Sequence, residues 1–157
     1  MKATVVGIYT ASISGTQLRS VPQATLEAGK GLVGDRYFLG VGTFSKKIIA
    51  SEAEITLIES EEIERFNSTE QAAHSPGEFR RNIVTRGIKL NDLVGKRFLL
   101  GAALLEGKRL CEPCAHLAKL VNAPVVKGMV HRAGLRAQIL SGATVQVGDE
   151  IRAEGAV

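Results

Sequence analysis

The chain has 157 residues, a length that fits one domain with a real buried core. Hydrophobic residues make up 45% of it, charged residues 23% and aromatic residues only 4%, which is ordinary for a soluble globular protein but weighs against a surface that stacks nucleic-acid bases. No segment has the length of a membrane span, and the N-terminal residues lack a signal-peptide pattern. We therefore expect a cytoplasmic protein that binds neither nucleic acid nor a membrane.

Most apolar segments are short, rich in β-branched residues and bounded by glycine, as strands are. Nine strands are predicted, at residues 4–9, 24–27, 54–58, 82–85, 97–100, 103–106, 135–140, 144–147 and 150–153. Two helices are predicted. The first, at 60–66, opens with acidic residues, and the second, at 113–121, has Pro113 at its first position. Many short strands and seventeen glycines favour a mainly β fold with a few short helices. We expect a closed or nearly closed β-barrel forming a single domain over residues 1–157, with a sandwich as the alternative.

The only cysteines, Cys111 and Cys114, lie in the most basic part of the chain. Residues 79–136 contain twelve Lys or Arg and three Asp or Glu, a net charge of +9. Cations favour the thiolate, which is the reactive and metal-binding form of cysteine, and they attract anionic ligands. In the first turn of the predicted helix, Cys114 would also gain from the helix dipole. It falls on the apolar face of that helix as well, so packing in the core is the alternative.

Cys111 could be a second ligand, a resolving thiol or a residue without a role. A Cys-x-x-Cys pair is half of a zinc site, but the histidine spacing of the chain matches no zinc finger. A disulfide between two cysteines this close gains little chain entropy, and cytoplasmic thiols stay reduced. We therefore expect Cys114 to be the more reactive thiol.

Two further segments carry candidate ligand-binding residues. If residues 80–86 alternate as a strand, Arg80 and Asn82 share a face and suit phosphate or carbonyl recognition, whereas Arg81 and Arg86 fit a solvated edge. The loop at 31–36 is framed by glycines that permit close backbone approach to a ligand. Its Asp-Arg ending could equally orient a barrel loop.

Together these motifs resemble a MOSC domain, the fold found at the C-terminus of molybdenum cofactor sulfurases. The matching segments are Val-Val-Gly-Ile near the N-terminus, Gly-Leu-Val-Gly-Asp-Arg at 31–36, Phe-Arg-Arg-Asn-Ile-Val-Thr at 79–85, Leu-Val-Gly-Lys-Arg-Phe at 93–98, Cys-Glu-Pro-Cys at 111–114, Gly-Leu-Arg-Ala-Gln-Ile-Leu-Ser-Gly at 134–142 and Thr-Val-Gln-Val-Gly-Asp-Glu-Ile at 144–151. One departure is Tyr37, where the family usually has histidine.

The resemblance implies a barrel related to the pyruvate kinase barrel domain, with one functional cysteine at the position of Cys114. In the sulfurases this residue is thought to carry persulfide sulfur. In the related amidoxime-reducing enzymes it ligates the molybdenum of a pyranopterin cofactor, whose phosphate is held by basic and polar residues. By motif position these include Arg80 and Asn82. The further candidates for cofactor binding are Thr85, Arg36 and Asp35.

Three hypotheses follow. In the first, the protein binds the molybdenum cofactor through Cys114 and reduces N-hydroxylated compounds. In the second, it is a non-catalytic carrier whose Cys114 persulfide, or bound cofactor, serves a redox or molybdoenzyme partner. In the third, it is a structural barrel with an inert cysteine. The substrate, the electron donor and the choice between molybdenum and tungsten stay open.

Overall fold

The computed structural model describes residues 2–13, 16–42, 50–113, 117 and 125–154. Within them the chain is mainly β, with a closed barrel of seven strands. The barrel strands pair in the order β11-β7-β8-β9-β5-β6-β1, and β1 pairs again with β11 to close the ring. Their bounds are β1 Ala3–Thr10, β5 Ile55–Glu59, β6 Ile83–Arg86, β7 Arg97–Leu100, β8 Ala103–Leu110, β9 Leu135–Ser141 and β11 Glu150–Ala153.

Shorter elements surround this barrel. Strand β2 (Arg19–Ser20) extends the sheet from β1, and a separate three-stranded sheet has the order β10-β3-β4. The bounds of these strands are β3 Gln23–Glu27, β4 Gly31–Leu32 and β10 Ala143–Gln146. The helices whose bounds fall in the described ranges are α1 (Ser60–Thr69) and α3 (Val125–Gly128), with single 3₁₀ turns at η1 (Ala50–Glu52), η2 (Pro76–Phe79) and η3 (Leu90–Leu93).

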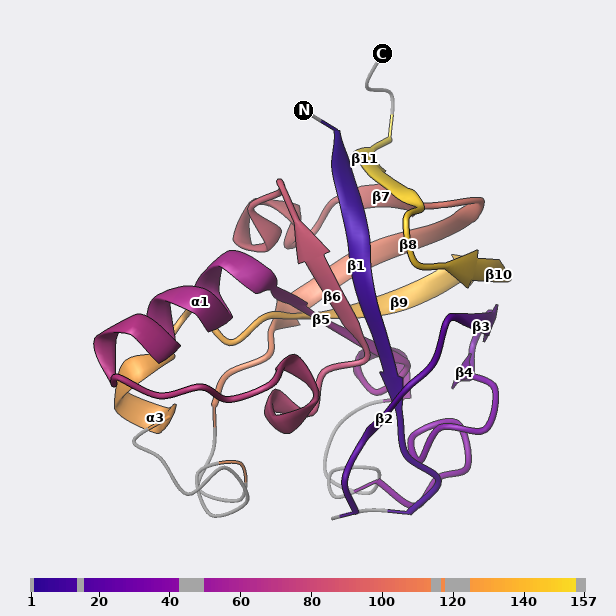
Figure 1. Cartoon of the computed structure of the whole chain (residues 1–157). Coiled ribbons are helices and arrows are strands. Elements are labelled where there is room, and N and C mark those ends of the chain that lie inside the picture. Colours follow the sequence, from indigo (N-terminus) through magenta and orange to yellow (C-terminus); the bar gives the residue numbers. More distant parts are fainter. Residues whose placement is uncertain (1, 14–15, 43–49, 114–116, 118–124, 155–157) are drawn as a thin grey trace.

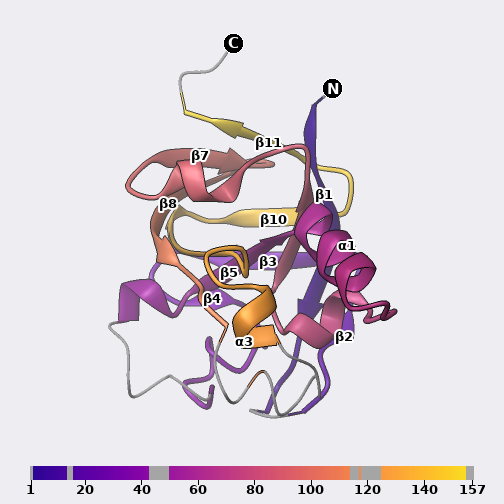
Figure 2. The ribbon, with the colours of Figure 1, turned by 90° about the vertical axis from the view of Figure 1, so that its left-hand side faces the viewer.

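All barrel pairs are antiparallel except β5 and β6, which run parallel. Parallel neighbours need a crossover connection, and α1 followed by η2 provides it. Figures 1 and 2 show the two termini at one end of the barrel. The described residues that directly follow β1, at 11–13, and β8, at 111–113, lie toward the opposite end.

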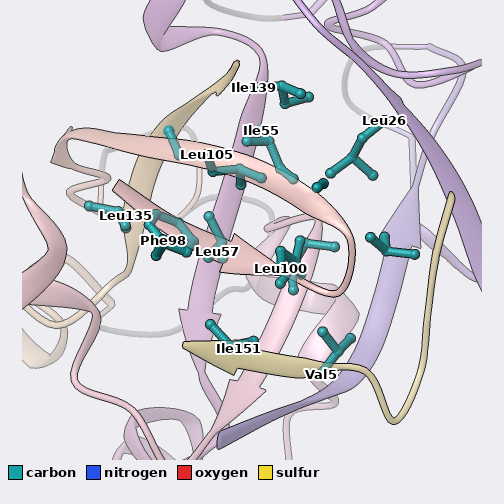
Figure 3. Packing of buried hydrophobic residues seen from close by; sticks show 14 of the residues in the cluster. Val5, Leu26, Ile55, Leu57, Phe98, Leu100, Leu105, Leu135, Ile139 and Ile151 are labelled. Atoms are coloured by element: carbon teal, nitrogen blue, oxygen red, sulfur yellow. The ribbon is translucent and has the colours of Figure 1, made fainter. Parts of the chain in front are cut away.

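The core fills the barrel interior with apolar side chains from every barrel strand. Phe98, Leu100 and Leu105 meet there, as Figure 3 shows, and each is fully buried. A second apolar cluster lies between α1 and the outer face of the parallel pair, where Ile58 and Val84 contact Phe66 and Ile63. Strands β5 and β6 are thus covered on both faces, which explains why adjacent residues, Leu57 with Ile58 and Ile83 with Val84, are both apolar and buried.

The structure confirms the mainly β fold and the closed barrel predicted from the sequence. Each of the nine predicted strands is present, but only β7 and β11 match at both ends; the fourth, for example, begins at Ile83 and not at residue 82. The first predicted helix is confirmed and extends to Thr69. Of the second, Pro113 is not helical and Leu117 is helical and buried, while most of its length lies outside the described residues. No helix in the described part of the chain is long and apolar enough to cross a membrane.

Candidate functional site

Arg80 stands where η2 ends and the chain turns toward β6. Its backbone is left-handed, with φ of 64°, and its side chain is only 8% exposed. One guanidinium nitrogen, Nη1, donates to the backbone oxygen of Thr16. The other, Nη2, is buried and has no hydrogen-bond partner among the described residues. Burial, followed by repulsion from Arg36, lowers the pKa of the Arg80 guanidinium to about 10. Arg80 therefore has an unused, buried hydrogen-bond donor.

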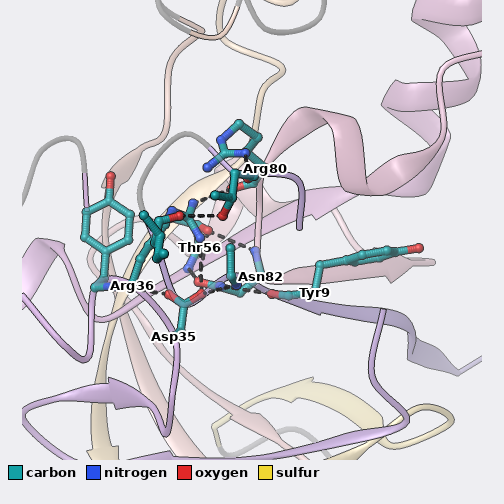
Figure 4. Close-up of polar contacts among 10 residues, drawn as sticks. Tyr9, Asp35, Arg36, Thr56, Arg80 and Asn82 are labelled. Carbon is teal, nitrogen blue, oxygen red and sulfur yellow. Dashed lines mark hydrogen bonds and ion pairs between the residues drawn. The ribbon is translucent and has the colours of Figure 1, made fainter. Parts of the chain in front are cut away.

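Asp35 and Arg36 form a buried pair that fixes the position of Arg80. The Asp35 carboxylate accepts hydrogen bonds from the Ala11 N–H at 3.1 Å, from Arg36 Nη1 at 3.1 Å and from the Tyr37 N–H at 3.3 Å. Arg36 Nη2 donates to the backbone oxygen of Arg80 at 3.1 Å, and its guanidinium lies 4.9 Å from the centre of the Tyr37 ring. Figure 4 shows this network joining the loop after β4 to the start of β6.

Asn82 is engaged with the barrel wall. Its Oδ1 accepts from the N–H and the Oγ1 of Thr56, both at 3.2 Å, and its Nδ2 donates to the Tyr9 backbone oxygen at 3.1 Å (Figure 4). This bond uses one of the two N–H groups that the Nδ2 atom carries. Thr85 is fully buried, and its hydroxyl donates to the Ile58 backbone oxygen at 3.4 Å. The structure thus places Thr85 in the barrel wall and brings Arg80, Arg36, Asp35 and Asn82 together.

The placement of Arg81 on a solvated edge is wrong. Arg81 is 7% exposed, and its guanidinium donates to the backbone oxygens of Phe79, Ala133, Cys111 and Glu112. Strand alternation does not apply to Arg80 and Arg81 because β6 begins only at Ile83 and Arg80 is left-handed. Arg86 is partly exposed and forms an ion pair with Glu64, but it does not lie on an edge, because β6 pairs with both β5 and β1.

Three arginines, which we call the arginine cluster, thus converge at one place: Arg36, Arg80 and Arg81. Each is more than nine-tenths buried, as is Asp35. Asp35 pairs with Arg36, and the hydrogen bonds described for Arg80 and Arg81 go to backbone oxygens. Buried charge is costly when it is not compensated. An anionic ligand at Arg80 Nη2 would supply both the missing acceptor and the missing charge, so these residues fit a phosphate group.

The cysteine loop, residues 111–113, lies beside the arginine cluster. Cys111 is 2% exposed, and its N–H donates to the Gly134 backbone oxygen at 2.8 Å. Glu112 accepts the His131 N–H at 2.7 Å and lies 2.5 Å from His131 Nδ1. Cys114 itself lies outside the described residues. In the described ranges, no three His, Cys, Asp or Glu side chains gather in a way that could hold a metal ion.

Sequence reasoning missed two contributions to this site. Arg81 belongs to the Phe-Arg-Arg-Asn segment, so the motif indicated its position in the chain. The sequence predicted a solvated side chain there, whereas the Arg81 side chain is buried. The link between His131 and Glu112 joins residues nineteen apart, and no local pattern signals it.

A family model described as MOSC domain matches residues 24–152. The chain therefore belongs to the MOSC domain family, and the barrel and the ordered motifs agree with this assignment. No curated protein matches the chain in sequence.

Solved structures share the fold. YuaD from Bacillus subtilis superposes with a TM-score of 0.81 at 20% identity, covering 96% of this chain and 94% of its own. YiiM from Geobacillus stearothermophilus superposes with a TM-score of 0.73 at 15% identity, and the match covers 96% of this chain and 74% of that protein. YiiM from Escherichia coli superposes with a TM-score of 0.70 at 20% identity, and the match covers 100% of this chain and 71% of that protein. At these identities the likeness establishes the fold alone.

Proposed function

We propose that this MOSC protein binds a molybdenum–pyranopterin cofactor and reduces N-hydroxylated compounds. Cys114 would be the metal ligand, and the arginine cluster would receive the anionic phosphate of the pterin. The substrate class follows from the resemblance to the amidoxime-reducing MOSC enzymes. When bound, the metal centre would supply the change of oxidation state that the reduction requires.

The buried Nη2 of Arg80 carries this proposal. A guanidinium nitrogen without an acceptor is rare in a protein interior, because leaving it unpaired costs free energy. Charge-assisted hydrogen bonds from arginine to phosphate are strong and geometrically specific. The local excess of positive charge favours an anion over a neutral ligand.

The other candidate residues would act at different distances from the ligand. Asn82 has one amide N–H to offer, since its other polar atoms bind Thr56 and Tyr9. Arg36 and Asp35 would orient Arg80 through its backbone oxygen. We assign Thr85 to the support of the wall, because its hydroxyl already donates to Ile58.

The test is metal and pterin analysis of protein made in a host that synthesises the molybdenum cofactor. We expect bound molybdenum or tungsten together with pterin fluorescence. Replacing Cys114 by Ser should remove the metal and leave some pterin, because the phosphate contact does not involve the thiol. The loaded protein should then reduce an amidoxime when a chemical electron donor is supplied.

The same preparation distinguishes a carrier from a reductase. Protein that holds persulfide on Cys114, releases that sulfur or its cofactor to a partner enzyme and shows no reductase activity would be a carrier. Protein that holds neither metal, pterin nor persulfide would contradict both functions.

A further inference from the structure

Arg81 is a clamp built from hydrogen bonds to backbone oxygens. Nε donates to the Ala133 oxygen at 2.8 Å, and Nη1 donates to the Phe79 oxygen at 3.2 Å. Nη2 donates to the oxygens of Cys111 at 2.8 Å and of Glu112 at 3.3 Å. The four acceptors lie on three separate segments. One buried side chain therefore joins the end of η2, the cysteine loop and the turn before β9.

This clamp requires the shape of a guanidinium. Arginine presents its donors in a planar fork, whereas lysine has a single nitrogen on a flexible stem. A lysine at position 81 could keep the charge but could not reach three segments at once. The role of Arg81 is therefore geometric, and the conservative substitution separates geometry from charge.

The cysteine loop has two more attachments to the turn that precedes β9. The Cys111 N–H donates to the Gly134 oxygen, and the Glu112 carboxylate receives the His131 N–H. Cys111 is 2% exposed as a result. The thiol of Cys111 can meet a reagent only when these attachments open, so its labelling rate measures that opening.

Arg80 and Arg81 are neighbours in the chain but have different tasks. Arg80 has the unpartnered Nη2, and Arg81 holds the cysteine loop. Their like charges, with that of Arg36, repel one another inside the protein. An anion at Arg80 would reduce this repulsion, so it would favour the arrangement in which all three guanidiniums stay buried.

We propose that Arg81 is a positioning residue that couples the two halves of the site: an anion held by Arg80 stabilises the closed cysteine loop through the Arg81 clamp. The proposal rests on the proposed function only for the anion contact at Arg80. It needs no metal, no pterin and no placement of Cys114.

The experiment measures alkylation of Cys111 in a Cys114→Ser variant, where it is the only thiol. The probe is inorganic phosphate, with chloride at matched ionic strength as the reference. An anion that binds only the closed loop slows opening by a factor of about ten at roughly ten times its dissociation constant. We expect labelling to slow accordingly, and Arg80→Gln to abolish the effect.

The clamp is tested by Arg81→Lys in the same background. We expect labelling at least about tenfold faster, because charged hydrogen bonds are lost. Phosphate should still bind, as calorimetry would show, but should protect Cys111 much less. The matched control is Arg132→Lys, since Arg132 lies two residues from Gly134 and pairs with Glu62 at the surface. Its labelling and protection should equal those of the parent.

Equal protection of Cys111 by phosphate in Arg81→Lys and in the parent would overturn the coupling. The coupling would also be overturned if Arg81→Lys left the labelling rate of Cys111 equal to that of the parent, in phosphate and in chloride alike. Should Arg81→Lys fail to fold, hydrogen exchange in the unmodified protein tests the clamp instead. Phosphate must then slow exchange of the Cys111 amide and of the Arg81 Nε–H, which donates to the Ala133 oxygen, together, and slowing of the Cys111 amide alone would overturn the role of Arg81. Phosphate protection in a protein that never acquires metal or pterin would reject the proposed function and leave the coupling standing.

Discussion

Arg36 Nη2 donates to the backbone oxygen of Arg80 at 3.1 Å, so one buried arginine fixes the main chain of another. Its Nη1 is occupied by Asp35 at 3.1 Å. Arg36 thus neutralises the buried carboxylate and at the same time determines where the unpartnered nitrogen of Arg80 points. The orientation of the donor that we propose to bind an anion therefore depends on a residue forty-four positions earlier in the chain.

Replacing Arg36 by Ala should therefore destabilise the fold. It removes one partner of a buried ion pair and leaves Asp35 as an uncompensated buried charge, which typically costs about 3–5 kcal/mol. Urea unfolding at neutral pH measures the change. Arg97→Ala is the control, because Arg97 pairs with Glu106 at 3.7 Å and is 54% exposed. Its loss should cost about 1 kcal/mol or less, and equal losses in the two variants would refute the buried-pair argument.

Replacing Arg80 by Gln should weaken the binding of the pterin cofactor by roughly tenfold to a hundredfold, because a charge-assisted contact is lost. Equilibrium binding of the cofactor, followed by pterin fluorescence, measures this. Arg86→Gln is the matched control, since Arg86 also lies in the basic segment but pairs at the surface with Glu64. Arg81 is no suitable control because its side chain holds the cysteine loop. Equal affinities in the Arg80 and Arg86 variants would remove Arg80 from the site.

Glu78 should make stability depend on pH through the turn that precedes Arg80. Burial alone would raise the pKa of its carboxyl, but hydrogen bonds from the Ser75 N–H, His74 and the Ser75 hydroxyl outweigh burial and lower that pKa below 4.5. A carboxyl with a lowered pKa stabilises the fold above its unfolded pKa, and this contribution is lost as the pH falls through the folded value.

The parent should therefore be more stable than Glu78→Gln at pH 7, and the difference should shrink as the pH falls below 4.5. Urea unfolding between pH 7 and pH 3 tests this. Glu154→Gln controls for the removal of one exposed carboxylate. A difference that grows on acidification would show that the sign of the argument is wrong.

The fold was largely predictable because it depends on local pattern. Strands such as β7 and β11 show short apolar segments bounded by turn residues, and both were predicted with their exact bounds. The many short strands and glycines then favoured a closed or nearly closed barrel, and the resemblance to MOSC domains implied the same fold. The site was less predictable, because alternation between two faces holds only within a strand. Arg80 and Arg81 precede β6, so their directions depend on the turn at η2 and not on period two.

Long-range hydrogen bonds account for the rest of what the sequence could not predict. Asn82 looks like a ligand-binding amide in the motif, yet most of its polar atoms bind Thr56 and Tyr9, which are distant in the chain. The sequence shows that a polar residue is present, but it does not show which buried groups will form hydrogen bonds with that residue. The same holds for Arg81 and the cysteine loop.

Gly134 should be indispensable, because it meets two requirements at once. Its φ is 116°, a conformation that side chains other than glycine rarely adopt, and a Cβ there would lie 1.9 Å from the Leu57 backbone oxygen. Its own oxygen accepts the Cys111 N–H. Gly134→Ala must therefore push the start of β9 away from β5 and pull on the cysteine loop.

We expect this substitution to cost on the order of 3–5 kcal/mol, the sum of a clash with packed backbone and an unfavourable φ. Gly148→Ala is the matched control, since Gly148 has φ of 101° but open space where its Cβ would be. Only the conformational cost of about 1–2 kcal/mol should appear there. Thermal and urea unfolding measure both variants. In a Cys114→Ser background, any folded Gly134→Ala should also expose Cys111 to alkylation. Equal stabilities of the two alanine variants would show that contact with Leu57 does not constrain this turn.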